Sequence, residues 1–322
     1  MDKLIDLRPI DRLEIVILVD NTVCTKDATE DIVTPASGWV KPKEGELDLR
    51  SGHGLALLVK TELDDKTHQV LYDTGPSDEL LLYNAEVLGL DLTETDAIAI
   101  SHGHWDHMGG LLGALRAIGK SEVPVYLHNE MFRKRGIKSK ILFWTRIREL
   151  DPVPAKKDIE RFGGEPTHSP NPTLLANQTL MVGGEIPRIT SYEKGFPGHV
   201  AYMDGEWVPD QDVIDDSCLV AHVRDKGLVV MAGCSHAGIA NITRHASNMI
   251  QQKDILNIIG GFHLSGKNEV RIEPTINDLQ KYSPHYITPI HCTGSKAQHM
   301  MRKSFGDRYI KGCVGDRFVF EA

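Results

Sequence analysis

The chain has 322 residues, of which 41% are hydrophobic and 25% are charged, a composition typical of a globular protein rather than a disordered or fibrous one. Its formal net charge of −9 argues against a protein that binds nucleic acid. No apolar stretch approaches the ~20 residues of a membrane span, and the first residues lack the apolar core of a secretory signal. The five cysteines are scattered, which fits a reducing compartment, so we expect a cytoplasmic protein without a membrane partner.

Apolar runs separated by turn-forming residues predict an alternation of strands and helices. In the first 120 residues we expect strands at 13–19, 55–59, 69–72 and 97–100, helices at 79–90 and 111–118, and a loop at 22–52. After residue 215 we expect strands at 218–223, 228–232, 255–259 and 286–290, with helices ending near 252 and 281. Residues 129–215 show little periodicity. We therefore expect a single domain over residues 1–322, with an irregular insertion at about 129–215 that covers the active site.

Six unusual polar residues directly follow the ends of expected strands: Asp20, Asp73, His102, Cys234, His263 and His291. Strand ends on one side of a layered α/β sheet lie close together, and such folds usually place their sites there. We therefore expect these side chains to meet at one edge of the fold.

Residues 102–107 place four metal-ligand side chains in one short segment: His102, His104, Asp106 and His107. Neither a helix nor a strand would gather all four, whereas a loop made flexible by Gly103 would. Imidazole and carboxylate ligands favour zinc, iron or manganese over magnesium or calcium. The segment therefore predicts a transition-metal site.

The same four ligands indicate a second metal ion. They exceed what one tetrahedral ion needs when water is also bound, and Asp106 and His107 must point away from the first two histidines. Two-metal sites hold ions roughly 3.5–4 Å apart with a bridging hydroxide, which a bound ion makes available near pH 7. The further ligands are expected at later strand ends, where His236 and His291 stand.

Residues 102–107 also carry the signature of the metallo-β-lactamase superfamily, and the similarity extends along the whole chain. Further segments resemble one subgroup, labelled 7,8-dihydropterin-6-methyl-4-(β-D-ribofuranosyl)aminobenzene-5′-phosphate synthase and associated with methanopterin biosynthesis. These segments are residues 53–54 (HG), 73–75 (DTG), 101–104 (SHGH), 184–188 (GEIPR), 233–238 (GCSHAG), 260–264 (GGFHL) and 289–294 (PIHCTG).

The resemblance implies an α/β fold, a four-layer αββα sandwich with two mixed β-sheets, and both metal ions at one edge of the sheets. By position it implies that His102 and His104 bind the first ion. It also implies that Asp106 and His107 bind the second ion and that His291 completes the second site.

Two positions depart from the superfamily pattern. The bridging Asp that usually follows a glycine at a strand end is Cys234 here, and the histidine expected before the strand at 218–223 is replaced by Asp215 and Asp216. We therefore assign His236 as the third histidine of the first ion. Cys234 is either a thiolate ligand or a small buried neighbour.

Other residues are expected to support the site. Asp73 is expected to orient a metal-bound histidine, as metal sites generally require. With Asp106, His263 is our candidate for a catalytic role, as a substrate contact or proton shuttle, and its alternative is a structural role. We expect Asn21 and His53 to line the pocket. The cysteines Cys24, Cys292 and Cys313 are expected to be structural, and three side chains either cover the substrate or pack: Tyr192, Trp207 and His199.

Residues 131–157 carry a net charge of +7 within the acidic chain. Against Glu149 and Asp151 stand nine basic residues: Arg133, Lys134, Arg135, Lys138, Lys140, Arg146, Arg148, Lys156 and Lys157. Such a run is either a solvated face or a flap that recognises an anionic, phosphorylated substrate over the metals.

The sequence thus predicts a metal-dependent enzyme that acts on a small, anionic organic substrate with two divalent transition-metal ions, zinc first, and manganese or iron as alternatives. The leading version is the pterin-pathway synthase group. One alternative is a general metallo-hydrolase of phosphoesters, lactones or β-lactams that uses a metal-bound hydroxide. A second alternative is a non-catalytic metal sensor or binding protein, although such a site would normally be coordinatively closed.

Overall fold

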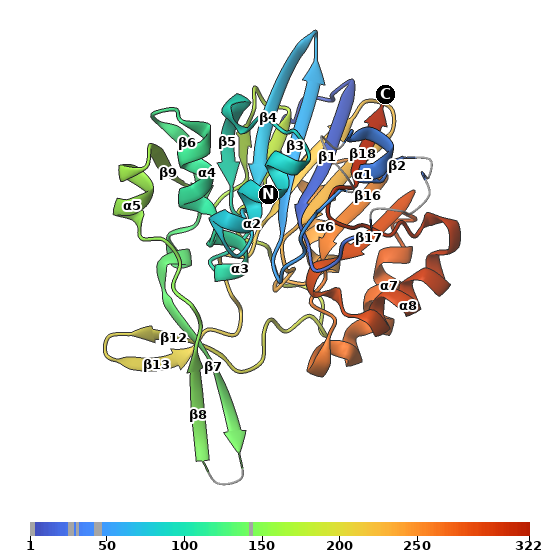
Figure 1. Cartoon of the computed structure of the whole chain (residues 1–322). Coiled ribbons are helices and arrows are strands. Elements are labelled where there is room, and N and C mark those ends of the chain that lie inside the picture. The colour runs from blue at the N-terminus through green and yellow to red at the C-terminus, as the bar shows by residue number, and fades with distance from the viewer. Residues whose placement is uncertain (1–3, 25–28, 30–31, 42–46, 142–143) are drawn as a thin grey trace.

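Three β-sheets organise the protein, seen in a computed structural model that describes residues 4–24, 29, 32–41, 47–141 and 144–322 (Figure 1). The first sheet has eight strands in the order β2 (Val33–Thr34), β18 (Arg317–Glu321), β1 (Arg12–Val19), β3 (Ala56–Leu63), β4 (Lys66–Tyr72), β5 (Thr95–Ala99), β6 (Val123–Leu127) and β9 (Gly164–His168). Pairing is antiparallel from β2 to β4 and parallel from β4 to β9, so the sheet is mixed.

The second sheet has six strands and is also mixed. Its order is β10 (Thr173–Leu175), β11 (Leu180–Val182), β14 (Cys218–Val223), β15 (Gly227–Ala232), β16 (Ile255–Gly261) and β17 (Tyr286–Ile290). The first four strands pair antiparallel and the last three parallel.

The two large sheets pack face to face and helices cover their outer faces, so the expected four-layer αββα sandwich is confirmed. Strand β1 shows why its sequence is an unbroken apolar run. Leu13, Ile15 and Ile17 face the core between the sheets, whereas Val16 and Leu18 face the helices outside. Both faces of the strand are therefore buried, as alternate side chains point to opposite faces.

Helices α2 (Asp78–Val87), α4 (Leu111–Ile118) and α5 (Lys156–Arg161) cover the first sheet. Helices α6 (Ile239–Ile250), α7 (Ile272–Gln280) and α8 (Ser295–Phe305) cover the second. Two short helices complete the set, α1 (Ala36–Trp39) and α3 (Trp105–Met108). Among helices in the described part of the chain, none combines the length and apolarity that crossing a membrane requires.

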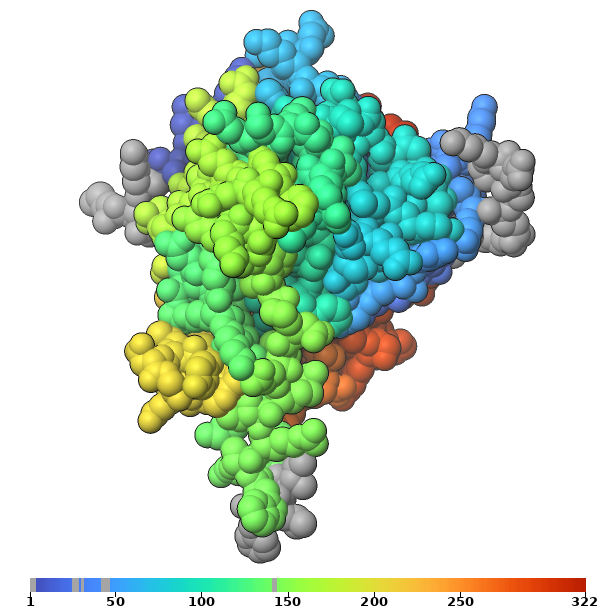
Figure 2. Space-filling model, turned by 60° about the vertical axis from the view of Figure 1, so that its left-hand side comes forward, coloured from blue at the N-terminus to red at the C-terminus, as the bar shows by residue number. Residues whose placement is uncertain are grey.

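The segment at about 129–215, which the sequence did not resolve into elements, contains several strands and helices as well as irregular stretches. Its strand β9 extends the first sheet, and β10 and β11 extend the second. Four more strands form a third sheet, the arm sheet, in the order β13 (Glu206–Pro209), β12 (His199–Met203), β7 (Lys134–Ile141) and β8 (Trp144–Glu149). Its hairpin β7–β8 projects from the body of the molecule (Figures 1 and 2). The apolar alternation is weak there because the projecting strands are mostly exposed.

Candidate metal centre

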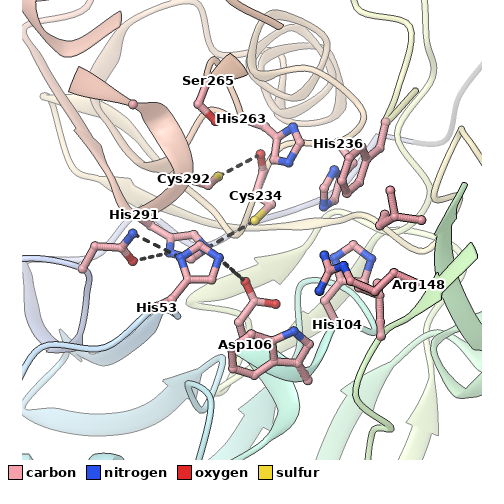
Figure 3. Close-up of a pocket in the computed structure, with 16 residues that line it drawn as sticks. His53, His104, Asp106, Arg148, Cys234, His236, His263, Ser265, His291 and Cys292 are labelled. Carbon is pink, nitrogen blue, oxygen red and sulfur yellow. Dashed lines mark hydrogen bonds and ion pairs between the residues drawn. The ribbon is translucent and has the colours of Figure 1, made fainter. Parts of the chain in front are cut away.

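The ends of strands from both large sheets meet around one cavity of about 530 Å³ (Figure 3). The backbone N–H of His291, after β17, donates to Asp20, after β1. The cavity is lined by Asn21, His53, His104, Trp105, Asp106, Ile137, Arg148, Leu150, Phe196, Cys234, His236, His263, Ser265, His291, Cys292 and Gly294.

Three buried histidines form the first cluster of metal-ligand side chains: His102, His104 and His236. One nitrogen of each lies within 4.8 Å of the others, and His102 Nε2 is 2.9 Å from His104 Nδ1. His236 follows β15, so the cluster joins the first sheet to the second.

The second cluster lies beside the first and contains Asp106, His107, Cys234 and His291, all buried. Cys234 Sγ is 3.2 Å from His107 Nε2 and 3.3 Å from His291 Nε2. Asp106 and His107 stand on the single-turn helix α3, not in the expected continuous loop. The turn points Asp106 toward His291, with Oδ2 and Nε2 3.6 Å apart.

Burial and neighbouring charges set the protonation of these groups. Burial, reinforced by neighbouring histidines, holds the pKa of His102, His104 and His236 well below the usual value. Burial raises the pKa of Asp106, but His107 and His291 outweigh it and hold that pKa well below its usual range. The first cluster is therefore neutral imidazole and Asp106 is carboxylate, the forms that bind a metal ion.

The donor set fits transition-metal ions, and the ring of His236 gives the clearest indication that an ion binds here. Both ring nitrogens of this buried side chain lack a hydrogen-bond partner within the described residues. A buried polar group without a partner is costly, and a metal ion bound to the ring would satisfy one nitrogen. Imidazole, thiolate and carboxylate ligands suit zinc or iron.

Two of the clustered histidines are oriented by contacts from the first sheet. His107 Nδ1 lies 2.7 Å from Asp73 Oδ2, which leaves Nε2 facing Cys234. Ser101 Oγ donates to Asp73 and lies 2.9 Å from His102 Nδ1, which leaves Nε2 of His102 facing the first cluster. Buried Asp73 thus supports both clusters without being a member of either.

Asn21 and His53 line the cavity and also contact members of the second cluster. The Asn21 carbonyl oxygen lies 3.0 Å from His291 Nδ1 and accepts a hydrogen bond from it, so Nε2 of His291 faces Cys234 and Asp106. His53 Nε2 lies 3.3 Å from Asp106 Oδ2.

Gly103 is required by close packing rather than for flexibility. A Cβ atom at this position would lie 2.3 Å from the carbonyl oxygen of Met131. Arg135 donates to the Gly103 oxygen at 3.1 Å, and Asp215 accepts from the Gly103 nitrogen at 2.8 Å. The segment between the first two histidines is therefore held from outside by long-range contacts.

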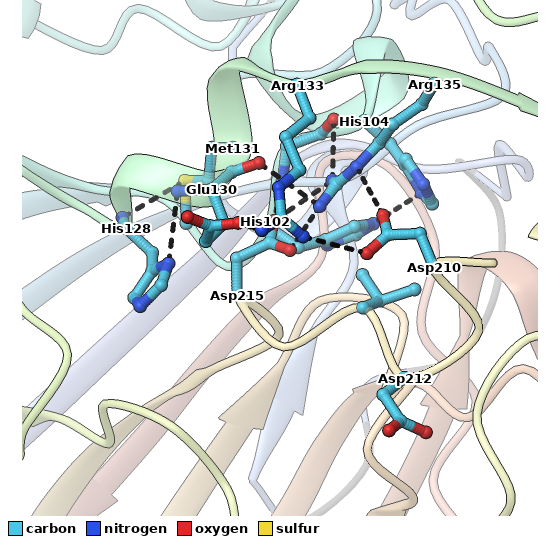
Figure 4. A network of polar contacts seen from close by, with 12 residues as sticks. His102, His104, His128, Glu130, Met131, Arg133, Arg135, Asp210, Asp212 and Asp215 are labelled. Atoms are coloured by element: carbon cyan, nitrogen blue, oxygen red, sulfur yellow. Dashed lines mark hydrogen bonds and ion pairs between the residues drawn. The ribbon is translucent and has the colours of Figure 1, made fainter. Parts of the chain in front are cut away.

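The basic run divides into paired and unpaired cations. Arg133 forms ion pairs with Glu130 and Asp210, and Arg135 with Asp210 and Asp215 (Figure 4).

Lys134 pairs with Glu149 at 2.8 Å. Lys138, Lys140, Arg146 and Arg148 have no ion-pair partner in the part of the chain that the structure describes. Among the described residues that line the cavity, Arg148 is the only basic residue of the Lys or Arg type.

The remaining expected residues separate into those at the cavity and those away from it. His263 lines the cavity, and Asn268 donates to its Nδ1 at 2.8 Å. Burial, with His291 next, lowers the pKa of His263 to about 4, so its ring is neutral at pH 7. Cys292 is also on the cavity wall. Four side chains do not line the cavity: Cys24, Cys313, Tyr192 and Trp207.

Sequence reasoning missed several residues that shape the site. Ser101 directly precedes His102, and this adjacency is the sequence feature that could have indicated its role. Phe196 stacks on His236 with ring centroids 5.3 Å apart and also contacts His263. His199, left open between covering and packing, lies 3.0 Å from His104 through the Nε2 atoms of both rings.

Comparisons with known proteins show which family and which fold the chain shares. Residues 51–183 match the Metallo-beta-lactamase superfamily. The chain is 31% identical over 274 residues to the 7,8-dihydropterin-6-methyl-4-(beta-D-ribofuranosyl)-aminobenzene-5'-phosphate synthase of Methanocaldococcus jannaschii, covering 84% of this chain and 90% of that protein. The fold resembles the crystal structure of Tm1679, a metal-dependent hydrolase of the beta-lactamase superfamily, with a TM-score of 0.71, 24% identity and coverage of 96% and 99%.

Proposed function

Because the chain belongs to the metallo-β-lactamase superfamily, we propose that it is an enzyme that uses two divalent transition-metal ions to act on a small anionic organic substrate. The observation that carries this proposal is the pair of ligand clusters beside one open cavity. A cavity of about 530 Å³ lies in the range of small-molecule sites. A purely structural or sensing site would instead be coordinatively closed.

His102, His104 and His236 would hold the first ion, and Asp106, His107, Cys234 and His291 would hold the second. Zinc is the first choice for imidazole and thiolate ligands, with iron or manganese next. When bound, such ions act as Lewis acids and lower the pKa of bound water.

The chain's own side chains would select and orient the substrate. Arg148 would bind an anionic group, because a guanidinium forms strong, paired hydrogen bonds with phosphate or carboxylate. His263, neutral at pH 7, would donate a hydrogen bond from Nε2, since its Nδ1 already accepts from Asn268. Phe196 would exclude water from the side of the cavity formed by His236 and His263.

Within this class we propose the pterin-pathway synthase reaction first, on the resemblance to the M. jannaschii relative over most of both chains. The rival is hydrolysis of a phosphoester, lactone or β-lactam with the same two ions.

One experiment separates the synthase from the hydrolase. Metal-free protein, restored with zinc, manganese or iron, would be assayed for joining a 7,8-dihydropterin that carries a leaving group on its 6-methyl carbon to the amine of 4-(β-D-ribofuranosyl)aminobenzene 5′-phosphate. The new carbon–nitrogen bond replaces the bond to the leaving group, which is released together with the amine proton. Parallel assays would follow hydrolysis of the three ester and lactam classes. We expect metal-dependent joining activity. Metal-dependent hydrolysis alone would replace the synthase with the rival, and inactivity in every assay despite two bound ions would contradict both.

A further inference from the structure

Four of the five clustered histidines have a contact that uses one ring nitrogen and leaves the other facing the ligand cluster. For His102, His107 and His291 the contacting residue lies one or two positions after the end of a strand of the first sheet, namely Ser101, Asp73 and Asn21. For His104 the contact comes from the arm sheet, which carries His199 at the start of β12. His199 is buried, with 1% of its surface exposed.

The hydrogen bonds of His199 determine which nitrogen of His104 carries the proton. His199 Nδ1 lies 2.9 Å from the backbone oxygen of Asp210, and a carbonyl oxygen only accepts, so Nδ1 is the protonated nitrogen. In a neutral ring the other nitrogen, Nε2, is then an acceptor. It is 3.0 Å from His104 Nε2, so His104 donates from Nε2 and keeps an unprotonated Nδ1.

The unprotonated nitrogen of His104 is the one that faces the first cluster. His104 Nδ1 lies 2.9 Å from His102 Nε2, whose own proton is on Nδ1 beside Ser101. Two lone pairs therefore point at the same place, an arrangement that is unfavourable unless a cation lies between them. The carboxylate of Asp210 lies 3.4 Å from His199 Nδ1, and Arg133 and Arg135 face the same carboxylate.

We propose that His199 is a positioning residue for the first metal ion: it accepts a hydrogen bond from His104 Nε2 and so presents the lone pair of His104 Nδ1 to the ion. This inference rests on the proposed metal site. It adds a link between that site and the arm sheet, since His199 pairs with Ile137 of β7, and Ile137 pairs with Arg148 of β8.

Directly opposed residues in an antiparallel sheet point to the same face. His199, Ile137 and Arg148 therefore lie in one row on the same face of the arm sheet. In this row His199 contacts the metal-ligand histidine His104, while Ile137 and Arg148 line the cavity.

The test compares three substitutions of His199. His199→Gln places an amide oxygen near the original Nε2 and retains an acceptor for His104. His199→Asn places its amide near the original Nδ1, so it keeps the bond to the Asp210 carbonyl but loses the acceptor. His199→Phe loses both contacts at similar ring size. His222→Phe, which removes a half-buried histidine on β14 away from both clusters, is the matched control.

The measurement is the affinity for Zn²⁺ and Co²⁺ by competition with a chelator, with the visible spectrum of bound Co²⁺ as a second readout. We expect His199→Asn and His199→Phe to bind one of the two ions about 10- to 100-fold more weakly, with an altered Co²⁺ spectrum and an unchanged second ion. His199→Gln should retain most of the affinity, and His222→Phe all of it. The unfolding midpoint of metal-free His199→Asn should match that of His199→Gln.

Other outcomes decide against the proposal. If the parent protein binds two ions and all His199 variants bind them equally well, the positioning role is wrong while the proposed function stands. An equal loss of metal affinity in His199→Gln and His199→Asn would mean that His199 acts only through packing. A parent protein that binds no transition metal would overturn the proposed function, and this inference with it.

Discussion

The guanidinium group of Arg135 and the carboxylate of Asp215 form a buried ion pair that holds both backbone polar atoms of Gly103. The pair joins the arm sheet to the segment that precedes β14, and Gly103 lies between the first two histidines of the metal centre. The position of these histidines therefore depends on residues far away in the chain. Arg135 and Asp215 do not line the cavity; they fix the backbone that carries the two histidines.

Removal of Arg135 should destabilise the protein strongly. In Arg135→Met the fully buried Asp215 would lose its counter-charge, and breaking a buried pair in this way costs about 3–5 kcal/mol. Urea unfolding of the metal-free protein would measure the loss. The control is Arg116→Met, which breaks an exposed pair with Asp78 and should cost about 0–1 kcal/mol. Equal costs for the two variants would contradict a structural role for the Arg135–Asp215 pair.

The two clusters should bind metal separately. We expect about two transition-metal equivalents in protein purified without chelator, because the clusters contain three and four ligands. Asp106→Ala should retain one equivalent in the first cluster, and His236→Ala should retain one in the second. Elemental analysis after metal addition and desalting gives the count. A parent protein that never exceeds one equivalent would rule out the two-ion site.

Asp73→Asn should weaken metal binding without abolishing it. Asp73 accepts from Ser101 and contacts His107 but belongs to neither cluster, and loss of such an orienting contact typically costs 10- to 100-fold in metal affinity. Chelator competition measures this change. Asp96→Asn is the control, because Asp96 contacts His68 at 3.1 Å away from the metal centre. Complete loss of metal in Asp73→Asn would instead make Asp73 a ligand.

Arg148→Gln should reduce activity on a substrate with an anionic group. A hydrogen bond to a charged group contributes about 1.5–3 kcal/mol, so kcat/KM for that substrate should fall roughly 10- to 150-fold, with little change for a neutral analogue. Arg146→Gln is the matched control, since Arg146 lies two residues away on the same strand and does not line the cavity. If both substrates respond alike, Arg148 does not recognise the anion.

Much of the architecture follows from short-range patterns in the chain. The apolar run at 13–19 is long and continuous, so its assignment as a buried strand agrees with β1. The same holds for the hairpin of β3 and β4 and for helix α4, whose buried Leu111, Leu115 and Ile118 recur at helical spacing. The arm sheet escaped prediction because its projecting strands are mostly exposed and leave no apolar periodicity.

The sequence by itself determined most of the buried strands and the ligand-rich segment His102–His107, because strand periodicity and ligand spacing are local properties of the chain. Only the tertiary structure decided which ring nitrogen faces the clusters in four of the five clustered histidines, since those contacts join residues as distant as Asn21 and His291. It also divided the basic run: Arg135 is buried in ion pairs, while Arg148, 13 positions later, reaches the cavity unpaired among the described residues. A sequence shows which side chains are charged, but the packing of the fold decides which charged groups pair. A paired cation stabilises the protein, whereas an unpaired one is free to bind a ligand.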